Sequence, residues 1–229
     1  MPTDVLVERT VACPQCGHEE RRQIATGIPL AQAPELRNFI VDGHFHTFRC
    51  AACGTGFRLE LPLGYLDFER RLWFTVVPPT ALGDLPGALA LAQQAFQRTM
   101  STPPVQPWAG EVRRRLVFGL TSLREKLLLD AAGLDDHQVE GLKLALRTDP
   151  GLTQDAQHAL FFERTEGEDL IFTWTGPETP APDSAFEVRI PRHRLDAATP
   201  DGRPGDLAVD VRLHFTPWDA HPPPPRVDR

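Results

Sequence analysis

The sequence lacks any long uninterrupted apolar run. No stretch approaches the roughly 18 consecutive apolar residues that a membrane-spanning helix needs, and the opening MPTDVLVERT has no basic start followed by an apolar segment. We therefore expect a soluble, cytoplasmic protein with no membrane partner. With 229 residues and 41% apolar content, the chain is long enough to bury one large core or two small ones.

An excess of positive charge is also missing. The net charge is -7 and the isoelectric point is about 5.6. This balance argues against a protein whose whole surface binds nucleic acid or anionic membranes, although a local basic face stays open. The sequence also contains no phosphate-binding loop, no nucleophile motif and no signature of an open metal site, so it favours a protein that is not an enzyme.

Cysteine is scarce, and its four copies form two matched pairs. CPQCG contains Cys13 and Cys16, CAACG contains Cys50 and Cys53, and 33 residues lie between the pairs. In a reducing cytosol, cysteine pairs with this spacing bind a metal more often than they form disulfides. A glycine follows each pair and permits the positive φ that a chain needs where it curls around a metal.

Four thiolates complete the tetrahedral shell of zinc and leave no coordination position for water. The two pairs therefore predict one structural Zn²⁺ with the ligands Cys13, Cys16, Cys50 and Cys53. Two alternatives stay open, namely four ordinary buried thiols and a redox-active dithiol. A redox motif usually places one pair at a strand-to-helix turn, whereas both pairs here lie in ribbon-like surroundings.

Three histidines in the same region raise the alternative of a mixed site or a second metal. They are His18, His44 and His46. Because His44 and His46 flank a single residue, they would share one face of a strand. We expect them to be solvent-facing strand residues beside the metal turn, since the pattern fixes no carboxylate as a third ligand.

Local patterns in the N-terminal half predict a hairpin, a helix and a long strand. Alternation on both sides of the first cysteine pair predicts a hairpin whose turn carries the metal ligands. Residues 34–43 predict a helix with an apolar stripe of Leu36, Phe39 and Ile40, ended by Gly43.

The strongest strand signal lies at residues 72–78, LWFTVVP. Its Trp73 and Phe74 point to opposite faces, and both reach the core if a helix covers the outer face. The segment DLPGALALAQQAFQRTM predicts a helix of its own, with Asp84 as its N-cap.

The C-terminal half predicts further helices and hairpin strands. Ser122 and Glu125 match a capping box, and Asp135 predicts the start of a second helix. The three arginines at 113–115 fit a solvated edge strand. A hairpin turn is predicted at 166–169, where a glycine offers positive φ. Further strand-like segments lie at 186–195 and 207–215.

These elements predict an α+β protein. A zinc-ribbon-like antiparallel sheet domain with short helices, residues 1–105, precedes a second α+β region of helices and hairpin strands, residues 106–218. The second region either folds separately or packs as one unit with the first. Residues 219–229 are a proline-rich tail that we expect to be disordered.

Together these features resemble the CpXC domain proteins of bacteria and archaea. The likeness is carried by CPQCG, the short helix PELRNFIVDG, CAACG with FRLELPLGYLDFERRLWFTVVPP, and the block LREKLLLDAAGLDDHQVEGLKLAL, over roughly residues 8–146. The resemblance carries over the four cysteines as metal ligands and assigns no catalytic residue. One departure is that the second pair, CAAC, lacks the proline of the first.

The leading functional hypothesis is a protein-interaction or adaptor module, because a closed metal site without a reactive cluster leaves surface recognition as the function. The alternative is nucleic-acid binding by a face with interleaved basic and aromatic residues, namely Arg21, Arg22, Arg49, Arg58, Phe45, Phe48 and Phe57. Residues 1–80 hold eight basic and nine acidic residues, about -1 in total, which disfavours a phosphate-binding surface.

An enzyme is the third hypothesis. Its support is the histidine group, His18, His44 and His46, with Glu19 or Glu60 nearby.

Overall fold

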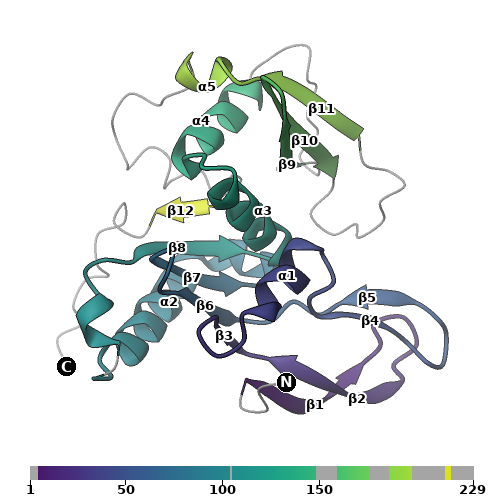
Figure 1. Ribbon diagram of the computed structural model, residues 1–229. Coiled ribbons are helices and arrows are strands. Elements are labelled where there is room, and N and C mark those ends of the chain that lie inside the picture. Colours follow the sequence, from purple (N-terminus) through teal and green to yellow (C-terminus); the bar gives the residue numbers. More distant parts are fainter. Residues whose placement is uncertain (1–4, 104, 148–158, 176–185, 198–214, 218–229) are drawn as a thin grey trace. The chain divides into compact units, whose positions relative to one another are not determined.

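The computed structural model describes residues 5–103, 105–147, 159–175, 186–197 and 215–217 (Figure 1). The chain divides into two compact units, Met1–Leu120 and Thr121–Arg229. The boundary that we expected between residues 105 and 106 stays a prediction. Among the described residues, no helix is both long and apolar enough to cross a membrane.

Two small hairpins form the cysteine-bearing part of the first unit. Strands β1 (Leu6–Ala12) and β2 (Glu19–Ala25) pair antiparallel, as do β4 (Thr47–Arg49) and β5 (Gly56–Arg58). Each hairpin turn carries one cysteine pair, which confirms the hairpin predicted at the first pair. Helix α1 (Glu35–Val41) connects the hairpins.

Helix α1 confirms the helix predicted from the sequence, but its buried face is narrower than predicted. Pro34 precedes it, and Gly43 follows with φ of 75°. Leu36 and Ile40 are buried, but Phe39 is 45% exposed. Only two of the three residues in the predicted apolar stripe are therefore buried.

A mixed sheet forms the core of the first unit. Its strands lie in the order β8-β7-β6-β3, with bounds Arg113–Phe118, Leu72–Val77, Leu63–Asp67 and Gly27–Pro29. β6 and β7 pair antiparallel, whereas β3 with β6 and β7 with β8 pair parallel. The α+β class is confirmed, and the parallel pairs are an addition that local sequence patterns did not show.

The parallel pair β7–β8 needs a long connection, and the chain supplies it as a helix. The connection contains η1 (Pro79–Asp84), α2 (Leu85–Met100) and η2 (Gln106–Trp108). The Asp84 side chain accepts a hydrogen bond from the Gly87 N–H, so the predicted N-cap is confirmed.

Helix α2 covers the sheet. It contacts β7 and β8, and the ring of Phe96 packs edge-on against Trp73 at 5.6 Å. Trp73 and Phe74 are both buried, as expected for a strand covered by a helix. The prediction of a solvated strand for the three arginines was wrong, because Arg115 is only 8% exposed and Arg113 and Arg114 are half-buried. The Arg114 guanidinium lies over the ring of Phe96 on α2, 4.9 Å from its centroid.

The second unit packs a helical hairpin on a three-stranded antiparallel sheet. The helices are α3 (Leu120–Ala131), which begins at the last residue of the first unit, and α4 (Asp136–Arg147). The strands lie in the order β11-β10-β9, with bounds Phe186–Pro191, Asp169–Thr175 and Ala159–Glu166. The short α5 (Arg194–Ala197) and β12 (Phe215–Pro217) complete the described elements.

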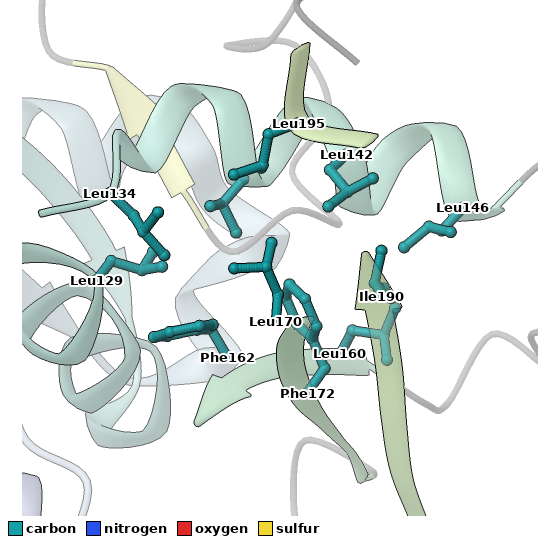
Figure 2. Close-up of a cluster of buried hydrophobic side chains, with 11 residues drawn as sticks. Leu129, Leu134, Leu142, Leu146, Leu160, Phe162, Leu170, Phe172, Ile190 and Leu195 are labelled. Atoms are coloured by element: carbon teal, nitrogen blue, oxygen red, sulfur yellow. The ribbon is translucent and has the colours of Figure 1, made fainter. Parts of the chain in front are cut away.

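Buried leucines and phenylalanines hold this second unit together. Figure 2 shows the cluster, in which Leu142 and Leu146 of α4 lie with Phe162, Leu170 and other side chains of the sheet. The hairpin β9–β10 turns at Gly167 with φ of 58°, as predicted. The predicted strand at 207–215 and the tail at 219–229 lie outside the described residues, apart from Phe215.

The capping box predicted from Ser122 and Glu125 was wrong. Helix α3 begins at Leu120, so both side chains lie inside the helix and are buried. The cap comes from a distant residue, since the carboxylate of Glu60 accepts a hydrogen bond of 2.9 Å from the Leu120 N–H. The Asp135 cap is confirmed by a 2.7 Å hydrogen bond from the His137 N–H.

Candidate metal centre

The two cysteine turns have the same backbone structure. We call Cys13–Gly17 the first knuckle and Cys50–Gly54 the second knuckle. In each, the N–H of the glycine donates to the carbonyl of the first cysteine over 2.9 Å. The φ angles of the glycines are 72° and 73°, a conformation that glycine adopts without strain. The sequence repeat is therefore a repeat of geometry.

The knuckles bring all four cysteine sulfurs together. The Sγ atoms lie within 4.8 Å of one another. Those of Cys13 and Cys53 are 3.7 Å apart, and those of Cys16 and Cys50 are 3.6 Å apart. A zinc ion with Zn–S bonds of about 2.3 Å needs sulfurs about 3.8 Å apart at tetrahedral angles, whereas a disulfide needs about 2.05 Å. The observed spacing fits a metal and excludes a disulfide.

The charges of four clustered thiols also favour a cation. The side chain and backbone of Thr55 lower the pKa of Cys53 to about 6. The backbone of His18 acts in the same direction on Cys16, but hydrogen bonding to Cys53, burial and the other thiols outweigh it and raise the pKa of Cys16 to about 12. With a pKa this high, the Cys16 sulfur stays protonated near neutral pH unless a bound divalent cation stabilises its thiolate.

Each knuckle buries its first sulfur and exposes its second. Cys13 and Cys50 are each 3% exposed, while Cys16 and Cys53 lie at the surface. The buried sulfurs of Cys13 and Cys50 come from different hairpins, so a metal bound to both would link the two hairpins. All four sulfurs come from the protein, which makes this a closed site with no position for a substrate.

Polar side chains of strand β2 connect the first hairpin to the second knuckle and to strand β4. The Glu20 carboxylate accepts a 2.7 Å hydrogen bond from the Ala51 N–H of the second knuckle. Arg22 pairs with Glu20 and donates to the carbonyl of Arg49 over 3.0 Å. These contacts were not predicted from the sequence. Their only signal was that Glu20 and Arg22 are two residues apart and so share one face of strand β2.

The histidines do not join this centre. Among the described residues, the four cysteines form the one group of three or more candidate ligands. His18 is exposed and lies 3.7 Å from the Glu20 carboxylate. His44 and His46 lie in a turn, with His44 exposed and His46 6% exposed. The expectation of two solvent-facing histidines on one strand face was therefore wrong.

Backbone conformation separates the two histidines. His46 has φ of 54°, which interrupts the alternation that a strand would have shown. Its ring stacks on Phe45 at 4.0 Å, and its Nε2 accepts a hydrogen bond from the Ala25 N–H of β2 over 3.1 Å. Burial lowers the pKa of His46 to about 4, against an opposing backbone contact with Leu59. His46 is thus a neutral core residue that joins the two hairpins.

Replacing His46 by asparagine, which tolerates positive φ, should remove part of the acid sensitivity of the fold. The pKa is about 4 when folded, and in the unfolded chain it returns to about 6.5. The unfolded state therefore takes up the proton first. The stabilising effect of neutral His46 is complete above about pH 6.5 and is lost as the pH falls toward about 4.

Urea unfolding of the metal-loaded protein at about pH 7.5 and about pH 5 measures this effect, which we expect to be on the order of 2 kcal/mol. The variant His46→Asn should lose that much less stability on acidification than the parent chain. His44→Asn, at an exposed position, is the control and should keep the parent's pH dependence. Equal pH dependence of His46→Asn and the parent would show that His46 does not contribute.

The candidate nucleic-acid face is largely neutralised. Of its arginines, Arg21 pairs with Glu8 at 3.1 Å, Arg22 pairs with Glu20, and Arg58 pairs with Glu60 at 2.8 Å. The aromatic residues are not free platforms either. Phe45 is buried, and Phe48 and Phe57 are half-buried against each other, with ring centroids 5.9 Å apart.

The two carboxylates proposed as partners of a histidine do not form a site. Glu60 binds Arg58 and the N-terminus of α3, while Glu19 is exposed on β2. In the described part of the chain, no hydrogen bond or ion pair joins either carboxylate to His18, His44 or His46.

The fold and the sulfur cluster define an α+β protein with four cysteines placed to hold a metal ion. The family described as CpXC protein matches residues 11–143, which is more than half of the chain and includes both knuckles. The chain belongs to the CpXC family. Comparison with curated proteins and with solved structures gave no match.

Proposed function

We propose that the protein carries one structural Zn²⁺ on its four cysteines and acts in the cytoplasm by binding another protein. The observation that carries the proposal is the closed sulfur cluster, with all four Sγ atoms within 4.8 Å. A site with four protein thiolates supplies folding free energy and has no open position at which water or a substrate could be activated.

Zinc is the metal that best suits these ligands. Thiolates are soft donors, and a tetrahedral arrangement of four sulfurs is typical of zinc or of iron–sulfur chemistry. The two hairpin knuckles, with C-x-x-C spacing in each, favour a single zinc ion. Bound metal would fix the β1–β2 hairpin against the β4–β5 hairpin and so shape the surface around them.

Charge favours a protein partner over nucleic acid. Three arginines near the knuckles, Arg21, Arg22 and Arg58, are paired with carboxylates, and binding them to phosphates would require breaking those pairs. The net charge of -7 adds a general repulsion from nucleic acid. A protein surface of mixed charge is compatible with both features.

A tagged pull-down from native extract of the source cells, with and without nuclease, tests the proposal. We expect a protein that stays bound after nuclease treatment, and that co-elutes with the purified chain at a fixed ratio in moderate salt. The metal-deficient variant Cys50→Ser should lose this partner. Retained material that disappears with nuclease, or turnover of a substrate by the purified chain, would contradict the proposal.

A further inference from the structure

Lysine is nearly absent from this protein, and both copies are buried. The chain has 24 basic residues, of which 22 are arginine and only Lys126 and Lys143 are lysine. These two are 2% and 7% exposed. Lysine is usually among the most exposed residue types. The chain therefore uses arginine elsewhere and keeps its two ammonium groups inside the second unit.

The two lysines form one ion cluster with two buried glutamates. We call Glu125, Lys126, Glu140 and Lys143 the buried quartet. Lys126 and Lys143 both donate to Oε1 of Glu140, with a distance of 2.9 Å for Lys143. Lys143 also donates to both oxygens of Glu125, at 2.9 and 3.0 Å. The two positive charges balance the two negative charges.

The quartet connects three elements of the second unit. Glu125 and Lys126 lie on α3, and Glu140 and Lys143 lie on α4. Glu125 accepts a further hydrogen bond of 2.7 Å from the Phe162 N–H of β9. The Nζ atoms of both lysines therefore become accessible only when α3 moves away from α4 and from strand β9.

The chemistry of amine acylation is blocked in this arrangement. The lone pair of a neutral Nζ must attack the acyl carbon, after which the leaving group departs and the nitrogen loses a proton. Burial lowers the pKa of Lys143, but the carboxylates of Glu125 and Glu140 outweigh burial and raise it above its usual value. The amine is thus charged, hydrogen-bonded and shielded from an acyl donor.

We infer that Lys126 and Lys143 form a cryptic modification site, which acyl donors reach only after the α3–α4 hairpin opens. Acylation removes the positive charge but leaves both carboxylates. Closing the hairpin afterwards would bury negative charge without its counterion, which is strongly unfavourable. Acylation would therefore keep the second unit open, and it would mark chains that have unfolded.

Labelling with the N-hydroxysuccinimide ester of acetic acid, read by peptide mass spectrometry, tests this inference. In the folded protein we expect no acetyl group on Lys126 or Lys143, and in concentrated urea we expect one on each. The control is Arg189→Lys on β11, where the arginine side chain is 54% exposed. Its new lysine should react in the folded protein. Reaction of Lys126 or Lys143 in the folded protein at a rate comparable to this control would overturn the inference.

A comparison of two orders of treatment tests whether acylation keeps the second unit open. Protein acetylated in urea and then diluted should fail to recover the amide-exchange protection of the Phe162 N–H. Protein treated while folded, quenched, unfolded and diluted in the same way should recover it. Equal recovery in the two samples would show that the buried charges are not needed for closure. Neither outcome depends on the metal or on the partner.

Discussion

Replacing Cys50 by serine should abolish metal binding and unfold the cysteine-bearing part of the first unit. Cys50 supplies one of the two buried sulfurs, and its Sγ lies 3.6 Å from that of Cys16. Serine is a poor ligand for zinc at neutral pH because its hydroxyl stays protonated. Structural zinc contributes roughly 10–16 kcal/mol in small zinc-binding peptides, which is as much as the whole stability of an ordinary domain, about 5–15 kcal/mol.

Elemental analysis and thermal unfolding measure this effect. We expect one zinc per chain in the parent protein, little or no zinc in Cys50→Ser, and loss of the parent's cooperative unfolding transition. Ala51→Ser is the matched control, because it adds the same hydroxyl at an exposed position of the same knuckle and removes no ligand. It should keep the metal. A Cys50→Ser protein with full zinc and unchanged unfolding would contradict the assigned ligands.

The knuckles could be predicted from sequence because everything that defines them is local. The cysteine spacing, the following glycine and the alternation of the flanking strands all act within a few residues. The structure adds the reason for the repeat, since both knuckles close with the same 2.9 Å backbone hydrogen bond from glycine to cysteine. The closeness of the two pairs was an inference from metal chemistry, which the structure supports.

The errors arose where a distant residue decides the local conformation. Ser122 and Glu125 match a capping box, yet α3 begins two residues earlier, at Leu120. Gly119 lies just before it with φ of 87°, and a side chain there would come within 2.9 Å of Pro79. The carboxylate that caps the helix belongs to Glu60. No pattern around residue 120 contains this information.

The histidines and the buried quartet show the same limit. His46 departs from strand geometry through a single positive φ, and its partner is the backbone of Ala25 on another strand. In the sequence, the quartet residues resemble the charged residues of any solvent-exposed helix face. Only the packing of the helices against each other and against β9 turns them into a buried cluster.

Breaking the buried quartet at a single position should strongly destabilise the second unit. The variant Lys126→Met leaves Glu140, which is fully buried, with only one of its two cations. The variant Glu140→Leu leaves Lys126 without its main partner. Removing one partner from a buried ion pair typically costs about 3–5 kcal/mol, because the remaining charge stays desolvated.

Removing Lys126 and Glu140 together should destabilise the second unit much less than removing either one alone. The double variant Lys126→Met with Glu140→Leu leaves Lys143 and Glu125, whose charges still balance at 2.9 Å. Replacing a buried pair by apolar residues of similar size is often neutral or stabilising. We therefore expect the double variant to be more stable than either single variant when unfolding is followed in urea by exchange of the Phe162 N–H. A double variant that loses the sum of the two single effects would show that Lys126 and Glu140 act independently and that the quartet is not one cooperative cluster.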